Sequence, residues 1–299
     1  ILLLGANGQV GWELQRSLAT LGELKICDRH TADLADFDHL QNTVREFSPD
    51  IIVNAAAYTA VDQAETESDQ AHRINAEAVS LLAREAKQLK AWLIHYSTDY
   101  VYDGEKSEPY IETDTPNPQS VYGTSKLLGE DAIRSSGCRH LIFRTSWVFA
   151  RRGANFAKTM LRLARERDSL SVVADQFGAP TGAELIADIT ALCLHRLTHD
   201  RDVAQSATGT YPLTPAGETS WHGFAKYLIS EAATHGISLR TTPENIQAIT
   251  TDNYPLPAKR PTNSRLSTQK LTDTFAVYLP PWRTHAKRLI AELALQDAP

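Results

Sequence analysis

The chain begins Ile1-Leu2-Leu3-Leu4-Gly5-Ala6-Asn7-Gly8-Gln9-Val10-Gly11. The four apolar residues predict a buried parallel strand, and the glycines after them predict a tight turn. Apolar spacing over residues 10–21 then indicates an amphipathic helix. Glycines at such a turn let a pyrophosphate approach the backbone at a helix N-terminus. Because a strand precedes the glycines and a helix follows them, this stretch predicts a dinucleotide-binding α/β domain.

Outward from this stretch, strands and helices alternate. We expect strands over residues 24–27, 51–53 and 92–96, helices over 37–47 and 68–89, and a further helix beginning at Tyr122. This alternation predicts a doubly wound parallel Rossmann sheet. After Phe149 we expect helices over 155–167, 182–197 and 219–235 and a strand over 170–174.

These elements suggest a division into two parts. We expect an NAD(P)-binding Rossmann domain over residues 1–150, which residues 182–235 partly rejoin. Residues 151–181 and 236–299 are then expected to form a second, smaller α/β substrate-binding lobe.

The predicted catalytic residues follow the fourth strand. Tyr122 and Lys126 are four residues apart, so both side chains lie on one helix face. A free phenol has a pKa of about 10, and an adjacent lysine ammonium together with an oxidised cofactor favours the phenolate. Thr98, at the carboxyl end of the strand, is placed to hydrogen-bond the same substrate oxygen. The pattern predicts acid–base chemistry by Thr98, Tyr122 and Lys126.

The second strand ends at two residues that bear on cofactor choice. Asp28 is placed to accept the adenosine ribose hydroxyls of NAD, whereas Arg29 is placed to meet the 2′-phosphate of NADP. Both NADH and NADPH therefore stay open as the cofactor.

Several longer motifs resemble the extended short-chain dehydrogenase/reductases that act on nucleotide sugars, and within them the dTDP-4-dehydrorhamnose reductases. They are Gly8-Gln9-Val10-Gly11-Trp12-Glu13-Leu14, Ala56-Ala57-Tyr58-Thr59-Ala60-Val61-Asp62, His95-Tyr96-Ser97-Thr98-Asp99-Tyr100-Val101, Arg144-Thr145-Ser146-Trp147-Val148, Asn155-Phe156-Ala157, Asp175-Gln176-Phe177-Gly178-Ala179-Pro180-Thr181 and Arg260-Pro261-Thr262-Asn263-Ser264-Arg265-Leu266. The resemblance covers essentially the whole chain.

The resemblance implies reduction of the 4-keto group of dTDP-4-dehydro-6-deoxy-L-mannose to dTDP-L-rhamnose, the last step of a synthesis that supplies sugars for lipopolysaccharide. Nicotinamide hydride goes to C4, Tyr122 donates the proton, Lys126 binds the nicotinamide ribose, and Thr98 orients the carbonyl. The cofactor contacts expected from the motifs and the resemblance are Gly5, Asn7, Gly8, Gln9, Val10, Gly11, Asp28, Arg29, Asp33, Leu34, Ala55, Ala56, Ala57, Tyr58, Thr59, Tyr96, Tyr122 and Lys126. Asp33 is also a candidate helix cap for residues 37–47.

The expected substrate contacts are Val61, Thr98, Asp99, Tyr100, Tyr122, Trp147, Asn155, Arg260 and Arg265. Trp147 also suits plain core packing at a strand end. Arg260 and Arg265 suit a clamp on the diphosphate, because guanidinium groups match phosphate oxygens, and they suit surface ion pairs equally well.

The resemblance further implies a homodimer with Mg²⁺ held by Glu13, Glu184 and Asp188. Solvated helix faces are the alternative for these acidic residues.

The composition argues against several classes of protein. A net charge of −6 argues against a nucleic-acid partner, and no basic run indicates a membrane surface. No apolar stretch approaches the ~20 residues of a spanning helix, and the chain opens on a strand, so we expect no signal peptide. The three cysteines lack metal-ligand spacing and indicate buried thiols in a reducing cytoplasm.

Three alternative functions fit the same residues less well. A nucleotide-sugar dehydratase typically has Asp-Glu after the Thr, but Asp99 is followed by Tyr100. An epimerase needs a further acid–base pair that the sequence does not reveal. A non-catalytic regulatory subunit of this fold would commonly have lost the Tyr/Lys pair, and this chain retains it.

Overall fold

A six-stranded parallel sheet forms the centre of the computed structural model, which describes residues 1–297 and side chains as far as residue 295. The strand order is β10-β5-β4-β3-β1-β2. The strands are β1 (Leu2–Leu4), β2 (Lys25–Cys27), β3 (Ile51–Asn54), β4 (Trp92–Thr98), β5 (Arg139–Thr145) and β10 (Gly209–Pro212). The chain reverses its direction of travel across the sheet between β1 and β3. Ligands of open parallel sheets bind at the carboxyl ends of the strands near such a point, and the predicted Rossmann fold is confirmed.

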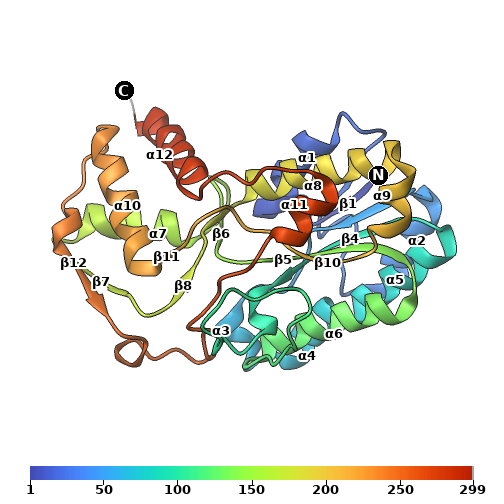
Figure 1. Cartoon of the computed structure of the whole chain (residues 1–299), viewed down its shortest axis with the longest axis horizontal. Coiled ribbons are helices and arrows are strands. Elements are labelled where there is room, and N and C mark those ends of the chain that lie inside the picture. Colours follow the sequence, from blue (N-terminus) through green and yellow to red (C-terminus); the bar gives the residue numbers. More distant parts are fainter. Residues whose placement is uncertain (298–299) are drawn as a thin grey trace.

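Helices cover both faces of this sheet (Figure 1). On one face, α1 (Gln9–Leu18) and α8 (Ala183–His199) pack on each other and on the sheet through an apolar cluster. On the other face lie α2 (Phe37–Phe47), α5 (Ala78–Leu89) and α6 (Val121–Ser136). The inner strands β1, β3 and β4 are therefore buried on both faces, as their continuous apolar runs predict, whereas the edge strand β2 exposes Ile26.

The helix expected over residues 68–89 is interrupted. It consists of α4 (Ser68–His72), a π-helical turn over Arg73–Glu77, and α5. The turn carries Asn75, whose side chain accepts from the Tyr58 N–H at 2.9 Å and donates to the Tyr58 carbonyl at 3.0 Å and to Ser125 at 3.0 Å. The irregular turn thus joins the segment after β3 to helix α6, and π-helical turns are frequent at functional sites.

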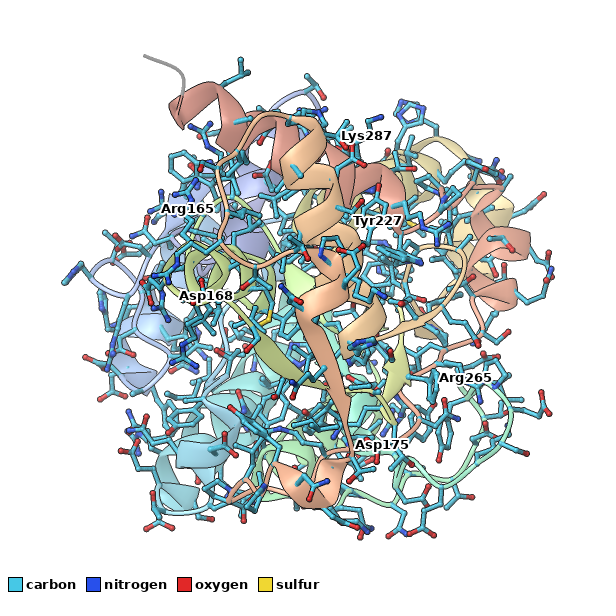
Figure 2. The ribbon with its side chains drawn as sticks, turned by 90° about the vertical axis from the view of Figure 1, so that its left-hand side faces the viewer. Arg165, Asp168, Asp175, Tyr227, Arg265 and Lys287 are labelled. Atoms are coloured by element: carbon cyan, nitrogen blue, oxygen red, sulfur yellow. The ribbon has the colours of Figure 1, made fainter. Side chains whose placement is uncertain are left out.

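A smaller lobe lies beside the sheet, on the left of Figure 1. Its helices are α7 (Phe156–Glu166), α10 (Trp221–Thr234) and α12 (Arg283–Asp297), and its strands β7 (Leu170–Val173) and β12 (Ile246–Ile249) pair in parallel. Phe224 and Leu228 of α10 pack with Leu161 of α7 and Ile290 of α12. Figure 2 faces this lobe and labels Tyr227 of α10, which donates to the Arg283 carbonyl at 3.4 Å.

Two segments therefore lie elsewhere than the sequence predicts. The helix over 219–235 is predicted to rejoin the nucleotide-binding domain, but the apolar face of α10 is buried between α7 and α12. Conversely, α11 (Gln269–Phe275) comes from the segment expected in the substrate lobe, and its Leu271 and Phe275 enter the cluster against α8 and β10.

Short elements connect the two parts. Strand β6 (Val148–Phe149) pairs in parallel with β9 (Thr181–Gly182), and β8 (Phe177–Gly178) pairs antiparallel with β11 (Thr219–Ser220). The remaining α-helices are α3 (Val61–Ala64) and α9 (Arg201–Ser206), and short 3₁₀ helices cover Asp99–Val101, Pro243–Asn245 and Thr251–Asn253.

A buried ion pair fixes α6 to the sheet. Arg144 of β5 donates to both carboxylate oxygens of Glu130, at 3.0 Å and 2.5 Å, and to the Tyr102 hydroxyl at 2.5 Å. Arg144 and Glu130 are 2% and 0% exposed, while Arg134 reaches the same carboxylate at 2.9 Å from the helix surface. This pair holds in place the helix that carries Tyr122 and Lys126.

None of the helices within residues 1–297 has both the length and the apolar character needed to cross a membrane. The cysteines Cys27, Cys138 and Cys193 are all buried and free.

Candidate active site

Two of the predicted catalytic side chains, Thr98 and Tyr122, lie next to each other at the carboxyl edge of the sheet, and Lys126 lies one turn further along the helix of Tyr122. Thr98 is the last residue of β4, and Tyr122 and Lys126 lie in the first turns of α6, which Ser120 caps by accepting from the Gly123 N–H at 3.1 Å. The Thr98 hydroxyl is close enough to the Tyr122 phenol to act on its pKa. The edge of the Tyr122 ring meets the ring of Tyr100, with centroids 5.6 Å apart. The sequence therefore brings the threonine and the tyrosine together as predicted.

Burial dominates the protonation of Tyr122. It raises the pKa of Tyr122 to about 12; the nearby Thr98 hydroxyl opposes this shift, and the nearby Asp99 adds to it. The phenol is therefore protonated near neutral pH, which is the state that a proton donor needs.

Lys126 is also fully enclosed. Its Nζ donates to the Tyr96 carbonyl at 2.6 Å and lies 3.3 Å from His95 Nε2. Burial lowers the pKa of Lys126 to about 8, and the charge of Glu130 opposes that shift. The lysine can thus change its charge close to neutral pH.

Asp99 adds a buried carboxyl beside this group. It accepts from the Thr98 hydroxyl at 3.1 Å, and its Oδ2 has no hydrogen-bond partner among the described residues. Burial raises the pKa of Asp99 to about 6, opposed by hydrogen bonds with Ser264 and Thr98. An unpaired buried acceptor is costly, so a ligand hydroxyl at this position would be favoured.

The glycine-rich turn between β1 and α1 packs its backbone closely against the segment after β3 and against itself, as a dinucleotide-binding turn requires. Gly5 has a φ of +80°, which favours glycine, and a Cβ there would lie 2.5 Å from the Ala56 nitrogen. A Cβ on Gly11 would lie 2.1 Å from the Gly5 carbonyl oxygen. The loop therefore fits a dinucleotide, and Gly8, Gln9 and Val10 complete it at the start of α1.

The residue expected to contact the adenosine ribose lies beside this turn. Asp28 accepts from the Asn7 side chain at 2.9 Å, and its other oxygen accepts from Thr31 at 3.0 Å. Arg29 is instead paired with Asp33 at 3.4 Å and is largely exposed. The carboxylate is thus ordered, whereas the guanidinium lies at the surface.

Other predicted cofactor residues divide by location. Asp33 accepts from the Ala35 N–H. The N-cap of α2 is Asp36, three residues after the predicted cap. The Leu34 side chain is buried in the core. The segment Ala55, Ala56, Ala57, Tyr58 and Thr59 follows β3 at the sheet edge.

Two tyrosines predicted to contact the cofactor use their hydroxyls to bond protein side chains instead. The Tyr96 hydroxyl forms a hydrogen bond with Thr190 in the core. The backbone carbonyl of Tyr96 faces the site and accepts a hydrogen bond from Lys126. The Tyr58 hydroxyl donates to Glu67 at 2.9 Å.

The predicted substrate residues also divide into two groups. Arg260 donates to Asp62 at 2.7 Å and lies 5.9 Å from the centroid of the Tyr100 ring, next to Tyr122. Its Nη1 is buried without a partner in the described part of the chain. Arg265, labelled in Figure 2, donates to Asn263 and to Glu218, as the ion-pair alternative predicts.

Trp147 and Asn155 are held by the smaller lobe. Trp147 has a φ of +51°, a costly conformation for a bulky residue, and stacks on Trp221 with centroids 3.6 Å apart. Asn155 caps α7 and donates to Gln9 of the glycine-rich turn at 2.9 Å. Val61 opens α3, directly before Asp62.

Arginines pair with two of the three predicted magnesium ligands. Arg288 lies 3.2 Å from Glu184, and Arg16 lies 2.8 Å from Asp188. Burial raises the pKa of Glu13 and of Glu184. Within the described residues, no three His, Cys, Asp or Glu side chains are grouped to hold a metal, so one protomer does not support the magnesium prediction.

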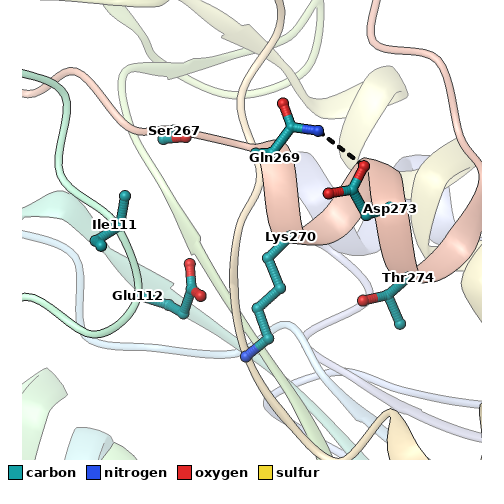
Figure 3. Close-up of a pocket in the computed structure, with 7 residues that line it drawn as sticks. All are labelled: Ile111, Glu112, Ser267, Gln269, Lys270, Asp273 and Thr274. Atoms are coloured by element: carbon teal, nitrogen blue, oxygen red, sulfur yellow. Dashed lines mark hydrogen bonds between the residues drawn. The ribbon is translucent and has the colours of Figure 1, made fainter.

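A separate open pocket of about 370 Å³ lies between the loop at Ile111 and helix α11 (Figure 3). Its Lys270 donates to the Thr210 carbonyl at 3.0 Å, and Gln269 donates to Asp273 at 2.8 Å. None of the predicted catalytic residues lines it.

Sequence reasoning missed the residues that support this site through distant contacts. They are Asn54, Asp62, Asn75, His95 and Trp221. Asp62 and His95 lie within the quoted motifs, but their partners are far away in the sequence.

Comparisons with known proteins identify relatives that match nearly the whole chain. The sequence model of the family described as "RmlD substrate binding domain" matches residues 1–295. The chain is 51% identical over 297 residues to dTDP-4-dehydrorhamnose reductase of Escherichia coli K12, covering 98% of this chain and 97% of that protein. It is 49% identical to the Burkholderia thailandensis enzyme of the same name, covering 99% of both. A crystal structure of dTDP-4-dehydrorhamnose reductase from Bacillus anthracis in complex with NADP superposes with a TM-score of 0.86 at 34% identity, covering 97% of this chain and 98% of that one.

Proposed function

The chain belongs to the RmlD substrate-binding-domain family, and from that membership we propose that it is an NAD(P)H-dependent dTDP-4-dehydrorhamnose reductase. It reduces the 4-keto group of dTDP-4-dehydro-6-deoxy-L-mannose and forms dTDP-L-rhamnose. The single observation that supports this most strongly is the placement of Thr98 next to Tyr122, with Lys126 on the same helix, at the carboxyl edge of a sheet with a dinucleotide turn.

We propose the following roles for the residues. The bound nicotinamide supplies the hydride that adds to C4. Thr98 donates a hydrogen bond to the substrate carbonyl oxygen, and Tyr122 gives its phenolic proton to that oxygen as negative charge develops there. Lys126 stabilises the resulting phenolate by its charge. Arg260 Nη1, the buried donor without a partner in residues 1–297, is placed to bind a polar group of the sugar nucleotide next to Tyr100.

The test is cofactor oxidation with enzymatically made dTDP-4-dehydro-L-rhamnose, with NADPH and NADH in parallel. Rapid loss of the reduced nicotinamide absorbance with either cofactor supports the proposal. Cofactor binding without oxidation would instead favour a regulatory subunit or a different sugar nucleotide.

Replacing Asp28 with Ala tests the cofactor contact. If its carboxylate accepts the ribose hydroxyls, the variant loses affinity for NADH more than for NADPH, by about 10-fold for one lost charged hydrogen-bond partner. Fluorescence titration with both cofactors measures this. Asp38→Ala, an exposed change on α2, is the matched control. An equal loss for both cofactors would refute the ribose contact.

We further propose a homodimer with Mg²⁺ between its subunits, as the sequence resemblance implies. The residues of one protomer do not fit a cation, because Arg16 and Arg288 already pair with Asp188 and Glu184. A metal would therefore require that these arginines move aside on assembly. After dialysis against a chelator, size-exclusion chromatography is expected to show monomers; unchanged assembly and activity would remove the magnesium from the proposal.

The location and biological role are proposed from the same chemistry. All three cysteines are free and buried, which suits a reducing cytoplasm. The product would supply rhamnose units to polysaccharides such as lipopolysaccharide.

A further inference from the structure

A buried chain of three polar side chains ends at Lys126. Its Nζ lies 3.3 Å from His95 Nε2, and the other ring nitrogen, Nδ1, lies 3.3 Å from Asn54 Nδ2. Lys126, His95 and Asn54 are 2%, 0% and 1% exposed. Asn54 ends β3 and His95 lies on β4, so two adjacent strands position the imidazole against the lysine.

The backbone fixes which way the Asn54 amide faces. The Ala56 N–H lies 3.2 Å from one side-chain atom of Asn54, and because a backbone N–H can only donate, that atom is Oδ1. The other atom, Nδ2, therefore faces His95 and donates to Nδ1.

This orientation determines the tautomer of His95. Burial, and then the charge of Lys126, hold the pKa of His95 well below its usual value, so the ring is neutral. A neutral imidazole has one N–H, and with Nδ1 accepting from Asn54 the hydrogen is on Nε2. That hydrogen points at the Lys126 amine.

We propose that Asn54 and His95 are positioning residues that set the charge of Lys126 by directing the His95 Nε2–H at its amine. A neutral amine accepts this hydrogen bond with its lone pair. An ammonium has no lone pair, so its N–H would face the N–H of the imidazole and the contact would be unfavourable. The other contact of the lysine, with the Tyr96 carbonyl, requires only one of its hydrogens. The effect of His95 on the lysine does not depend on the proposed reduction. Its consequence for catalysis does, because a lysine that titrates near neutral pH can change charge during turnover.

The other charged groups near this chain have identified partners. Glu130, one turn along α6, acts on Lys126 in the opposite direction. Its carboxylate is itself held by Arg144 of β5 and Arg134 of α6. Burial favours the neutral lysine, and in our proposal the His95 Nε2–H is the group from the sheet that adds to this effect.

The first test is ¹⁵N NMR of the cofactor-free protein labelled at histidine. His95→Gln identifies the resonances of His95. We expect Nδ1 to have the shift of an acceptor nitrogen and Nε2 that of a protonated one. The reverse assignment in the wild-type protein would overturn the inference, even if no variant of Asn54 folds.

The second test reverses the tautomer. In Asn54→Asp, the carboxylate accepts a hydrogen from Nδ1, so that Nε2 becomes an acceptor for the lysine ammonium. We expect the pKa of Lys126, measured by ¹³C NMR at Cε, to rise by about one unit or more. An unchanged pKa would contradict the proposal.

A double-mutant cycle separates this effect from the charge that the Asn54→Asp substitution adds. The same substitution in a His95→Leu background retains the charge but lacks the imidazole, and there we expect a clearly smaller shift. Equal shifts in both backgrounds would overturn the role of His95. These measurements need no turnover, so their failure is distinguishable from failure of wild-type protein to reduce the sugar nucleotide.

Discussion

Tyr122→Phe is expected to lower kcat by about 10²-fold or more, the scale of a lost general acid. The variant lacks only the hydroxyl, so its ring still meets Tyr100 edge-on and α6 keeps its cap at Ser120. The substrate oxygen would then receive a hydrogen bond from Thr98 but no proton from the protein. Steady-state kinetics with NADPH measures the loss, and fluorescence titration is expected to show cofactor affinity close to that of the wild type.

Tyr278→Phe is the matched control, because Tyr278 is 79% exposed and outside the site. Its turnover is expected to be unchanged. Near-normal turnover of Tyr122→Phe would remove this residue from its proposed role.

Arg144→Met is expected to lower the free energy of unfolding by about 3–5 kcal/mol, the cost of leaving a buried charge without its partner. Arg144 donates two hydrogen bonds to Glu130 in a site closed to solvent. Of the two arginines that contact this carboxylate, Arg134 then remains, and it reaches Glu130 from the helix surface. Urea denaturation monitored by circular dichroism measures the difference.

Arg162→Met provides the comparison, since its pair with Glu166 is exposed on α7. Such a pair contributes about 0–1 kcal/mol, so little change is expected. If Arg144→Met were as stable as this control, the buried pair would not hold α6 to the sheet.

Local sequence signals predicted the parts of the site that depend on local geometry. The glycine turn, the strand ending at Thr98 and the helix carrying Tyr122 each follow from residues within one turn or strand. The spacing of Tyr122 and Lys126 also sufficed to place both on one helix.

Contacts between distant residues could not be predicted in this way. Asp62 and Arg260 are 198 residues apart, and nothing near either residue indicates the other. The π-helical turn at Asn75 depends on contacts with Tyr58 and Ser125 rather than on propensity. Likewise, α10 has an apolar face that suits either lobe, and packing against α7 and α12 decides its place.

The proposed reduction is tested most directly by tracing the hydride. The purified protein would be given dTDP-4-dehydro-6-deoxy-L-mannose and NADPH deuterated at the transferable position, and the product examined by NMR. Our account predicts dTDP-L-rhamnose with deuterium at C4 of the sugar. Deuterium at any other carbon, or substrate that remains unreduced with cofactor bound, would contradict it.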